Sequence, residues 1–384
     1  MQIHEEQFLF LLKSYFNNEK VPEGFITDPD RVFFLASVHN MLPVVYSKLI
    51  ETSLDVSKYK KSVVSLCGNQ IRKNLVFESL FSELINNNIN IIVVKGPVCA
   101  NCYPEYEMRL SSDFDIITDE ESFDKLDSYL KENGYKESNG SYFSDNTGLY
   151  LEVSTQLGEG SESLRKTANV VFGDFFSRTI RSENYHTLSE TDHIAYLIFH
   201  AFKHFIGSGF GVKQLTDIYL FEKKYHDRID FDKMNESLKK MGITDFAYNI
   251  WYAIEKIFGC DFSFLLENAD YSKICYDDFI SDLLSAGVFG KSSEDRLHSA
   301  SVVQSAVENG GKKTVFKTIF PSVAVMKKKY KTVEKFPFLV PLFWLIRVIN
   351  YLFKAVLSDS EVSPLKSLDI AEDRIELMKK MGII

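Results

Sequence analysis

Strand-forming patterns are concentrated in one stretch of about 70 residues, from 89 to 158, and helical patterns occupy the sequence on both sides. Three runs in this stretch are typical of strands: INIIVVKG (89–96), FDIIT (114–118) and LYLEVST (149–155). The first two are apolar and rich in β-branched residues, and the third alternates apolar with polar residues. This grouping predicts one small sheet rather than a β-rich fold.

The segments between these runs predict how the sheet is connected. EESFDKLDSYLKENGYK has apolar residues at helical spacing and Gly134 as a stop, which predicts a helix between the second and third strands. Tyr142 and Phe143 predict a further strand that pairs with residues 149–155 across the polar turn SDNTG. The order of strand, helix, strand, helix and hairpin predicts a small α/β sheet.

Helices are expected before and after the sheet. One surrounds residues 7–17, a second opens with Asp28 as N-cap and Pro29 in its first turn, and a long one runs from about Val56 to Asn87. From about Ser161 onward we expect helices and no strands. The predicted fold class is α+β, predominantly helical, with a small mixed-sheet core. The expected domains are an N-terminal helical region (1–88), an α/β core (89–158) and a C-terminal helical region (159–384).

Composition limits the class of protein. With 384 residues, of which 45% are hydrophobic, the chain can bury a large core. Its formal net charge of −9 is typical of a cytosolic enzyme and does not favour a nucleic-acid partner. Five cysteines without a repeating framework indicate free thiols, and the N-terminal segment is acidic where a secretory signal is basic. We therefore expect a cytoplasmic protein.

One segment near the C-terminus could meet a membrane. Residues 336–357 are mostly apolar but carry Arg347, Asn350 and Lys354 on one side of a helix, which makes the segment amphipathic. The favoured interpretation is a helix packed on the protein's own core. Peripheral membrane contact, supported by the basic run at 327–331, and a spanning helix are the alternatives.

Two aspartates are the first residues that suggest chemistry. Asp113 and Asp115 alternate around Phe114 at the start of the second predicted strand, so both side chains leave on the same face. Two carboxylates this close repel each other unless a cation or proton lies between them, and Mg²⁺ is the usual cation where phosphate is the substrate. A strand start that is acidic only because it is exposed is the alternative.

Glu152 adds a carboxylate on the third predicted strand, where Leu151 and Val153 point to the opposite face. Three carboxylates on adjacent strands, Asp113, Asp115 and Glu152, can hold two Mg²⁺ ions. Such ions position a triphosphate and activate a hydroxyl for in-line displacement with pyrophosphate leaving. A simple salt bridge is the alternative for Glu152.

Residues near these aspartates are expected to bind phosphate. Lys95 and Gly96 end the first strand and precede a predicted helical turn, where backbone N–H groups and an ammonium can meet a phosphate. Arg109, Ser111 and Ser112 stand just before the aspartates and can clamp a triphosphate. A structural salt bridge is the alternative for Arg109.

A histidine pair lies further along the chain. His200 and His204 share one face of a predicted helix, with Lys203 between them. Three roles are open to them: structural histidines, residues lining the cleft near nucleotide or acceptor, and transition-metal ligands. The following GSGFG (207–211) comes after a helix rather than a strand, so we interpret it as a helix-ending turn and not a phosphate loop.

These motifs together resemble the uncharacterised nucleotidyltransferase family of the polymerase-β-type superfamily. VVKGPVCANCY, RLSSDFDIIT, the helix ending in ENGY, and LEVS stand in the order that this family shows. Lys95 with Gly96, Arg109, residues 112–115 and Glu152 match residue by residue. Serine stands two residues after Glu152, where the family usually has histidine, so the role of that histidine is not carried over.

The resemblance continues downstream. FHAFKHFIGSGFGVKQLTDIYLF is similar to the family's His-x-x-x-His helix followed by an Asp, carried here by His200, His204 and Asp217. IFPSVAVMKKKY with the segment 336–357 is similar to the family's C-terminal stretch. The resemblance implies a nucleotidyltransferase core, dependence on Mg²⁺ and an NTP as donor, and it leaves the acceptor open.

Three functions are open on this evidence. The leading hypothesis is an enzyme that transfers a nucleoside monophosphate from ATP or another NTP to a hydroxyl of a small molecule, sugar or protein, releasing pyrophosphate. A non-catalytic nucleotide-binding or membrane-peripheral module of the same fold is the alternative from another class. A metal-dependent phosphohydrolase is the third, and it would need His200 and His204 beside the aspartates.

Overall fold

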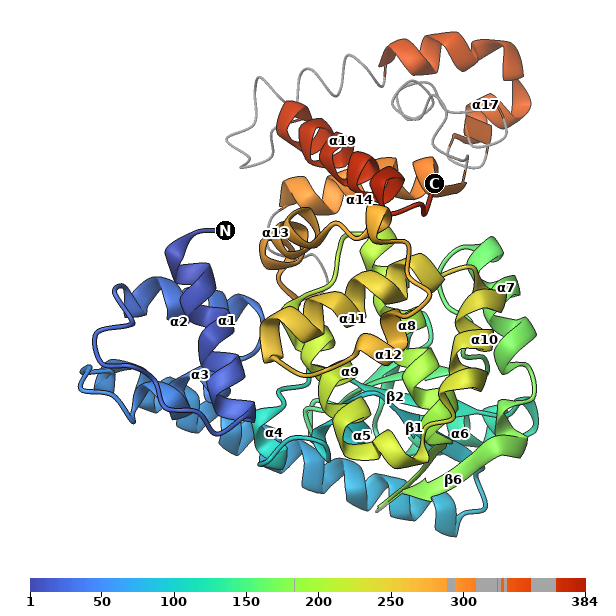
Figure 1. Ribbon diagram of the computed structural model, residues 1–384. Helices are drawn as coiled ribbons and strands as arrows, with labels where there is room; N and C mark the ends of the chain where they lie inside the picture. Colours follow the sequence, from blue (N-terminus) through green and yellow to red (C-terminus); the bar gives the residue numbers. More distant parts are fainter. Residues whose placement is uncertain (183, 289–293, 309–322, 324–325, 328–329, 347–363) are drawn as a thin grey trace. The chain divides into compact units, whose positions relative to one another are not determined.

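The computed structural model describes residues 1–182, 184–288, 294–308, 323, 326–327, 330–346 and 364–384 (Figure 1). The chain forms two compact units. The first comprises Met1–Lys203 and Val212–Asn268, and the second comprises His204–Gly211 and Ala269–Ile384. Helices predominate, and the strands form one small mixed sheet and a separate hairpin. The predicted α+β, mostly helical fold class is therefore confirmed.

Four helices open the first unit: α1 (Ile3–Phe16), α2 (Pro29–Val38), α3 (Leu42–Leu49) and α4 (Ser57–Asn86). The predicted start of α2 is confirmed, because the Asp28 carboxylate accepts a hydrogen bond from the backbone N–H of Arg31 at 3.1 Å. The long predicted helix is α4. Its Phe77 ring stacks on Phe114 with 4.3 Å between the centroids, which packs α4 against the sheet.

The sheet has five strands: β1 (Ile91–Val94), β2 (Phe114–Thr118), β3 (Lys136–Ser138), β4 (Ser141–Phe143) and β5 (Tyr150–Ser154). Their order is β1-β2-β5-β4-β3, and β2 and β5 are parallel while the other neighbours are antiparallel. The three predicted runs and the hairpin strand at 142–143 are confirmed. Strand β3 was not predicted; it is exposed and only three residues long.

Short helices connect the strands. α5 (Gly96–Ala100) directly follows β1, as expected, and η1 (Tyr106–Met108) precedes β2. α6 (Glu120–Glu132) follows β2, with Asp119 as its N-cap and Leu126 and Leu130 on its buried face. Its end just before Gly134, whose φ is 82°, confirms the predicted stop. The chain can thus return to place β5 parallel to β2.

The expectation of no strands after Ser161 is wrong. After α7 (Glu162–Phe172) and η2 (Phe175–Arg178), the strands β6 (Thr179–Ser182) and β7 (Tyr185–Leu188) form an antiparallel hairpin. Each strand has only four residues, too few to show a periodic pattern. The fully buried Tyr185 packs on Phe77 and Phe81 of α4, and β7 lies against β1. Tertiary burial therefore decides that this segment is extended.

The remaining helices of the first unit follow: α8 (Glu190–Ile206), whose last residues belong to the second unit, α9 (Val212–Tyr225), η3 (His226–Arg228), α10 (Phe231–Met241), α11 (Thr244–Phe258) and α12 (Ser263–Leu266). GSGFG is a turn after α8, since the N–H groups of Gly207 and Gly209 both donate to the His204 carbonyl. The predicted helix-ending turn is confirmed. All five cysteines are free, as expected.

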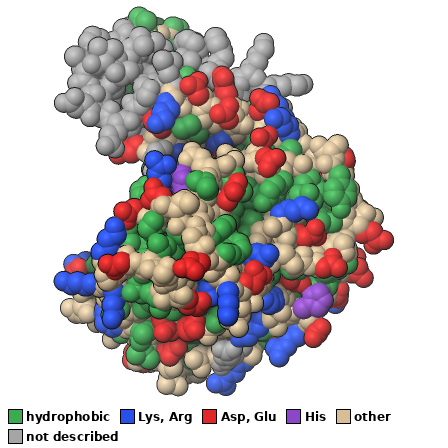
Figure 2. Space-filling view, turned by 60° about the vertical axis from the view of Figure 1, so that its left-hand side comes forward, with side chains coloured by type: hydrophobic (Ala, Val, Ile, Leu, Met, Phe, Trp, Pro, Cys, Tyr) green, Lys and Arg blue, Asp and Glu red, His purple; other side chains and the backbone are tan. Residues whose placement is uncertain are grey.

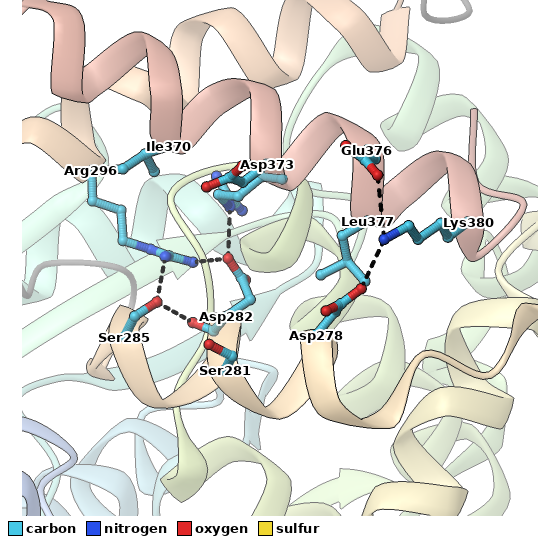
Figure 3. A pocket seen from close by; sticks show the side chains of 11 residues that line it. Asp278, Ser281, Asp282, Ser285, Arg296, Ile370, Asp373, Glu376, Leu377 and Lys380 are labelled. Atoms are coloured by element: carbon cyan, nitrogen blue, oxygen red, sulfur yellow. Dashed lines mark hydrogen bonds and ion pairs between the residues drawn. The ribbon is translucent and has the colours of Figure 1, made fainter. Parts of the chain in front are cut away.

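The described elements of the second unit are helical: η4 (Tyr271–Lys273), α13 (Tyr276–Ala286), α14 (Glu294–Glu308), α17 (Lys331–Lys335), η6 (Pro337–Leu339) and α19 (Pro364–Lys380). A pocket of about 390 Å³ lies among α13, α14 and α19 (Figure 3). Asp282 binds Arg296 at 2.8 Å and Arg374 at 3.2 Å, and Lys380 binds Asp278 at 3.1 Å. The pocket walls are thus tied together by ion pairs.

The predicted amphipathic segment 336–357 is described only in part. Arg347, Asn350 and Lys354, which define its polar side, lie outside the described residues. In the described part, Val340 is buried in a small cluster of apolar residues. No helix among the residues that the structure describes is long and apolar enough to cross a membrane.

Candidate active site

The sheet places two carboxylates side by side. β2 and β5 are parallel neighbours, and in their register Asp115 lies directly opposite Glu152. Residues opposite each other on adjacent strands project from the same face, so the two side chains are neighbours. Asp115 is 9% exposed, and Glu152 is open to solvent. The pair therefore has one buried and one accessible carboxylate.

Asp113 lies just ahead of β2 and is partly buried. The hydroxyl of Ser112 donates to its Oδ1 at 3.2 Å. The charge of Asp113 also acts on Lys73 of α4 and Lys213 of α9. Burial lowers the pKa of Lys213 to about 8 and that of Lys73 below its usual range, and Asp113 opposes both shifts. Asp113 thus lies within electrostatic range of one lysine from each of two helices.

Lys95 has a backbone conformation that is rare for a residue with a side chain, with φ at 55° and ψ at −118°. Its N–H donates to Nε2 of His193 at 3.2 Å. Burial lowers the pKa of His193 to about 3, so the ring is neutral. Its proton therefore lies on Nδ1, 3.3 Å from the Thr187 hydroxyl oxygen. The buried contact with His193 holds Lys95 in this strained conformation. Strained backbone of this kind is most common at functional sites.

The ammonium of Lys95 lies between two carboxylates. Its Nζ is 2.5 Å from Oδ1 of Asp115 and 3.7 Å from Oε1 of Glu159. Nδ1 of His200 is 3.4 Å from the same Nζ. Burial alone would lower the pKa of Lys95, but the two carboxylates outweigh it and raise this pKa well above its usual value. Lys95 therefore stays charged beside the predicted metal ligands.

Crowding changes the acidity of the carboxylates. Burial raises the pKa of Asp115 to about 7, with Asp113 and Glu159 adding to the shift and Lys95 opposing it. Partial desolvation and the charge of Asp113 raise the pKa of Glu152. Of the three predicted carboxylates, Asp113 is thus close enough to repel both Asp115 and Glu152. A cation bound among them would relieve that repulsion.

Glu159 belongs to the same cluster and was not predicted. It lies in the loop between β5 and α7, where its Oε1 accepts a hydrogen bond from the Tyr196 hydroxyl at 2.7 Å and its Oε2 pairs with Lys203. Burial alone would raise the pKa of Glu159, but Lys95 and Lys203 hold it well below its usual range. Acidic residues in loops follow no periodic pattern, so the only signal for Glu159 in the sequence is its position between two glycines.

Arg109 forms a buried salt bridge, one of the two roles considered for it. Its Nε and Nη2 donate to the two carboxylate oxygens of Asp217 at 2.9 and 2.8 Å, and its Nη1 donates to Ser111 at 2.5 Å. The Tyr103 hydroxyl donates to the same Asp217 at 3.0 Å. The Ser111 N–H donates to the Gln70 side chain at 2.8 Å. The segment before β2 is thus anchored to α9 and α4.

The two predicted histidines fall in different units. His200 belongs to the first, where its Nδ1 is 3.5 Å from Oε1 of Glu159, and burial lowers its pKa to about 3. Lys203 pairs with Glu159 from one turn further along α8. His204 belongs to the second unit. The structure therefore places His200 and Lys203 with the carboxylate cluster of the first unit.

The carboxylates can be compared with what Mg²⁺ requires. Among the described residues, no group of three or more His, Cys, Asp and Glu side chains is arranged to hold a metal ion. Mg²⁺ rarely uses such an all-protein cage, because it binds through one or two carboxylates and completes its shell with water and substrate phosphates. Asp113 and Asp115 supply such oxygens, with Glu152 beside them. The residues fit Mg²⁺ whose remaining ligands are water or the phosphates of a nucleotide.

Comparison with known proteins gives one match. A model of the uncharacterised nucleotidyltransferase family matches residues 27–259, which is more than half of the chain and contains every predicted site residue. The match ends before the C-terminal stretch that also resembled the family. Neither the curated proteins nor the solved structures include one that matches this chain. The chain belongs to the uncharacterised nucleotidyltransferase family.

Proposed function

We propose that this protein transfers a nucleoside monophosphate from an NTP to a hydroxyl group of an acceptor, with Mg²⁺ and with release of pyrophosphate. One observation carries the proposal: the register of β2 and β5 pairs Asp115 with Glu152, and Asp113 stands two residues earlier. Membership of the family supports nucleotidyl transfer in general. The carboxylates then have two uses, as ligands for a cation and as a base.

Glu152 is the group that we expect to accept the proton of the attacking hydroxyl. It is open to solvent, so an acceptor can reach it. Its raised pKa makes it a stronger base than an ordinary carboxylate. Mg²⁺, when bound by Asp113 and Asp115, would lower the pKa of the hydroxyl and neutralise charge on the triphosphate.

Other residues near the aspartates have different parts in binding the triphosphate. Lys95 supplies a positive charge beside the aspartates, and Gly96 is buried close to the backbone of the aspartate segment. Ser112 is exposed, so its hydroxyl can reach a phosphate. The contacts that Arg109 and Ser111 make with protein groups favour a positioning role for both. They hold the loop that carries Ser112 and the aspartates.

The surface supports a small acceptor rather than a polynucleotide. Acidic and basic side chains are interspersed over the face that Figure 2 shows. The chain as a whole has a formal charge of −9, and polynucleotide binding depends on a concentration of positive charge. We therefore expect the acceptor to be a small molecule, a sugar or a protein hydroxyl, with ATP or another NTP as donor.

Two labels on the same nucleotide test the reaction. The pure protein is incubated with Mg²⁺, a cell lysate and each NTP, labelled either on the α-phosphate or on the γ-phosphate. Nucleotidyl transfer moves the α-label onto an acceptor and releases the γ-label in pyrophosphate. We expect Asp113→Ala/Asp115→Ala to lose at least about a hundredfold of the transfer, because the cation loses its ligands. The control Asp124→Ala, at an exposed position of α6, should keep it.

The possible outcomes distinguish the proposed function from its two alternatives. Equal α-label transfer by wild type and the double aspartate variant would overturn the proposal. Binding of the NTP without any transfer would favour a non-catalytic nucleotide-binding module. Release of the γ-label as free phosphate, with the α-label left in the nucleotide, would favour a phosphohydrolase.

A further inference from the structure

The position of Lys95 raises a problem for any metal at this site. Its ammonium lies 2.5 Å from Oδ1 of Asp115, so it occupies one of the two oxygens through which this carboxylate can bind a cation. The side chains of both residues are about nine-tenths buried, at 10% and 12% exposed. Two cations cannot share one buried carboxylate oxygen at contact distance without strong repulsion. Binding of Mg²⁺ at this oxygen of Asp115 therefore requires the ammonium to move.

Glu159 is the carboxylate that could receive the ammonium. Its Oε1 is 3.7 Å from Nζ of Lys95, slightly beyond a direct hydrogen bond. The carboxylate is already held in place, with the Tyr196 hydroxyl on Oε1 and the Lys203 ammonium on Oε2. The face of the Tyr196 ring, with its centroid 5.9 Å from the ammonium, adds a further favourable contact for a cation.

The backbone of Lys95 does not need to move. Its N–H is fixed by His193 at 3.2 Å, and the peptide keeps its unusual conformation. A lysine side chain has four rotatable carbon–carbon bonds, so its head group can shift by an ångström or more while the backbone stays in place. The contact with Asp115 can therefore be exchanged for one with Glu159 by side-chain rotation alone.

We propose that Lys95 is a displaceable counter-ion: without metal its ammonium neutralises Asp115, and binding of a divalent cation moves it onto Glu159. Glu159 is then a positioning residue, which acts on the metal site through Lys95. This inference rests on the proposed function only in that Asp113 and Asp115 bind a divalent cation. It gives the unpredicted Glu159 a role in metal loading.

The test measures metal affinity without any nucleotide turnover. Mn²⁺, which replaces Mg²⁺ and is visible by electron paramagnetic resonance, is titrated into the full-length protein at about pH 8.5. Lys95→Met removes the competing cation, so we expect Mn²⁺ to bind at least about tenfold more tightly. Glu159→Gln removes the receiving carboxylate, so we expect binding at least about fivefold weaker than in wild type.

Two further variants separate this role from a general effect of charge. Lys203→Met also removes a partner of Glu159, but no contact joins Lys203 to Asp115 in the structure, so we expect a change below about threefold. In the double variant Lys95→Met/Glu159→Gln, the effect of the Glu159 change should fall below about twofold, because it acts through Lys95. Circular dichroism checks folding, and Lys95→Gln replaces Lys95→Met if that variant does not fold.

The outcomes distinguish this inference from the proposed function. Unchanged or weaker Mn²⁺ binding by Lys95→Met, with binding still lost in Asp113→Ala/Asp115→Ala, overturns the displacement alone. An undiminished effect of Glu159→Gln in the Lys95→Met background also overturns it. Identical Mn²⁺ binding by wild type and Asp113→Ala/Asp115→Ala overturns the metal site itself, and with it both proposals.

Discussion

Among single residues, Asp217 holds a guanidinium that is almost entirely out of water. The side chains of Arg109 and Asp217 are 6% and 5% exposed. Asp217→Ala would leave the charge of Arg109 buried and unpaired, so we expect the free energy of unfolding to fall by about 3–5 kcal/mol. Urea denaturation measures this. Lys131→Ala, which breaks a solvent-screened pair with Asp127, should leave the free energy of unfolding nearly unchanged. Equal losses in the two variants would contradict the prediction.

The pH dependence of stability can be traced to particular residues. The pKa of His193 is about 3 in the folded protein against an ordinary value of 6.5, so the unfolded chain takes up its proton first as the pH falls. The stability that the folded protein gains from keeping His193 neutral is therefore complete above pH 6.5 and is lost as the pH falls toward 3. Asp115 acts in the opposite direction: its pKa is raised to about 7, so the folded protein gains stability as the pH falls from 7 toward 4.

Comparison with a variant isolates the histidine. We expect His193→Gln, whose amide oxygen can still accept the Lys95 N–H, to lose about 2 kcal/mol less stability than wild type between about pH 6.5 and pH 5. Denaturation at a series of pH values measures the difference. His186→Gln, at an exposed position of β7, should follow the wild type. Parallel curves for wild type and His193→Gln would show that the histidine does not titrate as described.

At the scale of elements, two glycines should respond to alanine with opposite signs. Gly68 lies within α4 and Gly242 ends α10 at a φ of 71°, and a Cβ at either would meet no atom within 4 Å. Gly68→Ala should stabilise the protein by about 1 kcal/mol, since alanine favours the helix. Gly242→Ala should destabilise it by about 1 kcal/mol, because a side chain is strained in the left-handed region. Thermal denaturation with shifts of the same sign would contradict this.

At the scale of the whole molecule, one buried carboxylate connects three helices of the second unit. Asp282, with 8% of its side chain exposed, binds both Arg296 and Arg374, and so ties α13 to α14 and α19 (Figure 3). Asp282→Ala leaves two buried guanidinium groups without this partner. We expect hydrogen exchange to accelerate by at least about tenfold in these three helices while the amides of β1 and β2 keep their protection. Equal acceleration in the sheet would contradict the division into two units.

The amino-acid sequence by itself determined the features that depend on near neighbours. The β-branched runs became β1, β2 and β5, and the Asp28 N-cap begins α2, because strand and helix-end preferences act over a few residues. The alternation of Asp113 and Asp115 is equally local. These features were enough to predict the fold class and the family.

Only the tertiary structure decided which distant residues meet. The register that sets Glu152 opposite Asp115, the pairing of Arg109 with Asp217 and the contact of Lys95 with Glu159 each join separate segments. β6 and β7 are strands because β7 is buried against β1 and α4. Local preference is weak beside the free energy of burying apolar groups and pairing charges across the fold, so no pattern within one segment encodes these contacts.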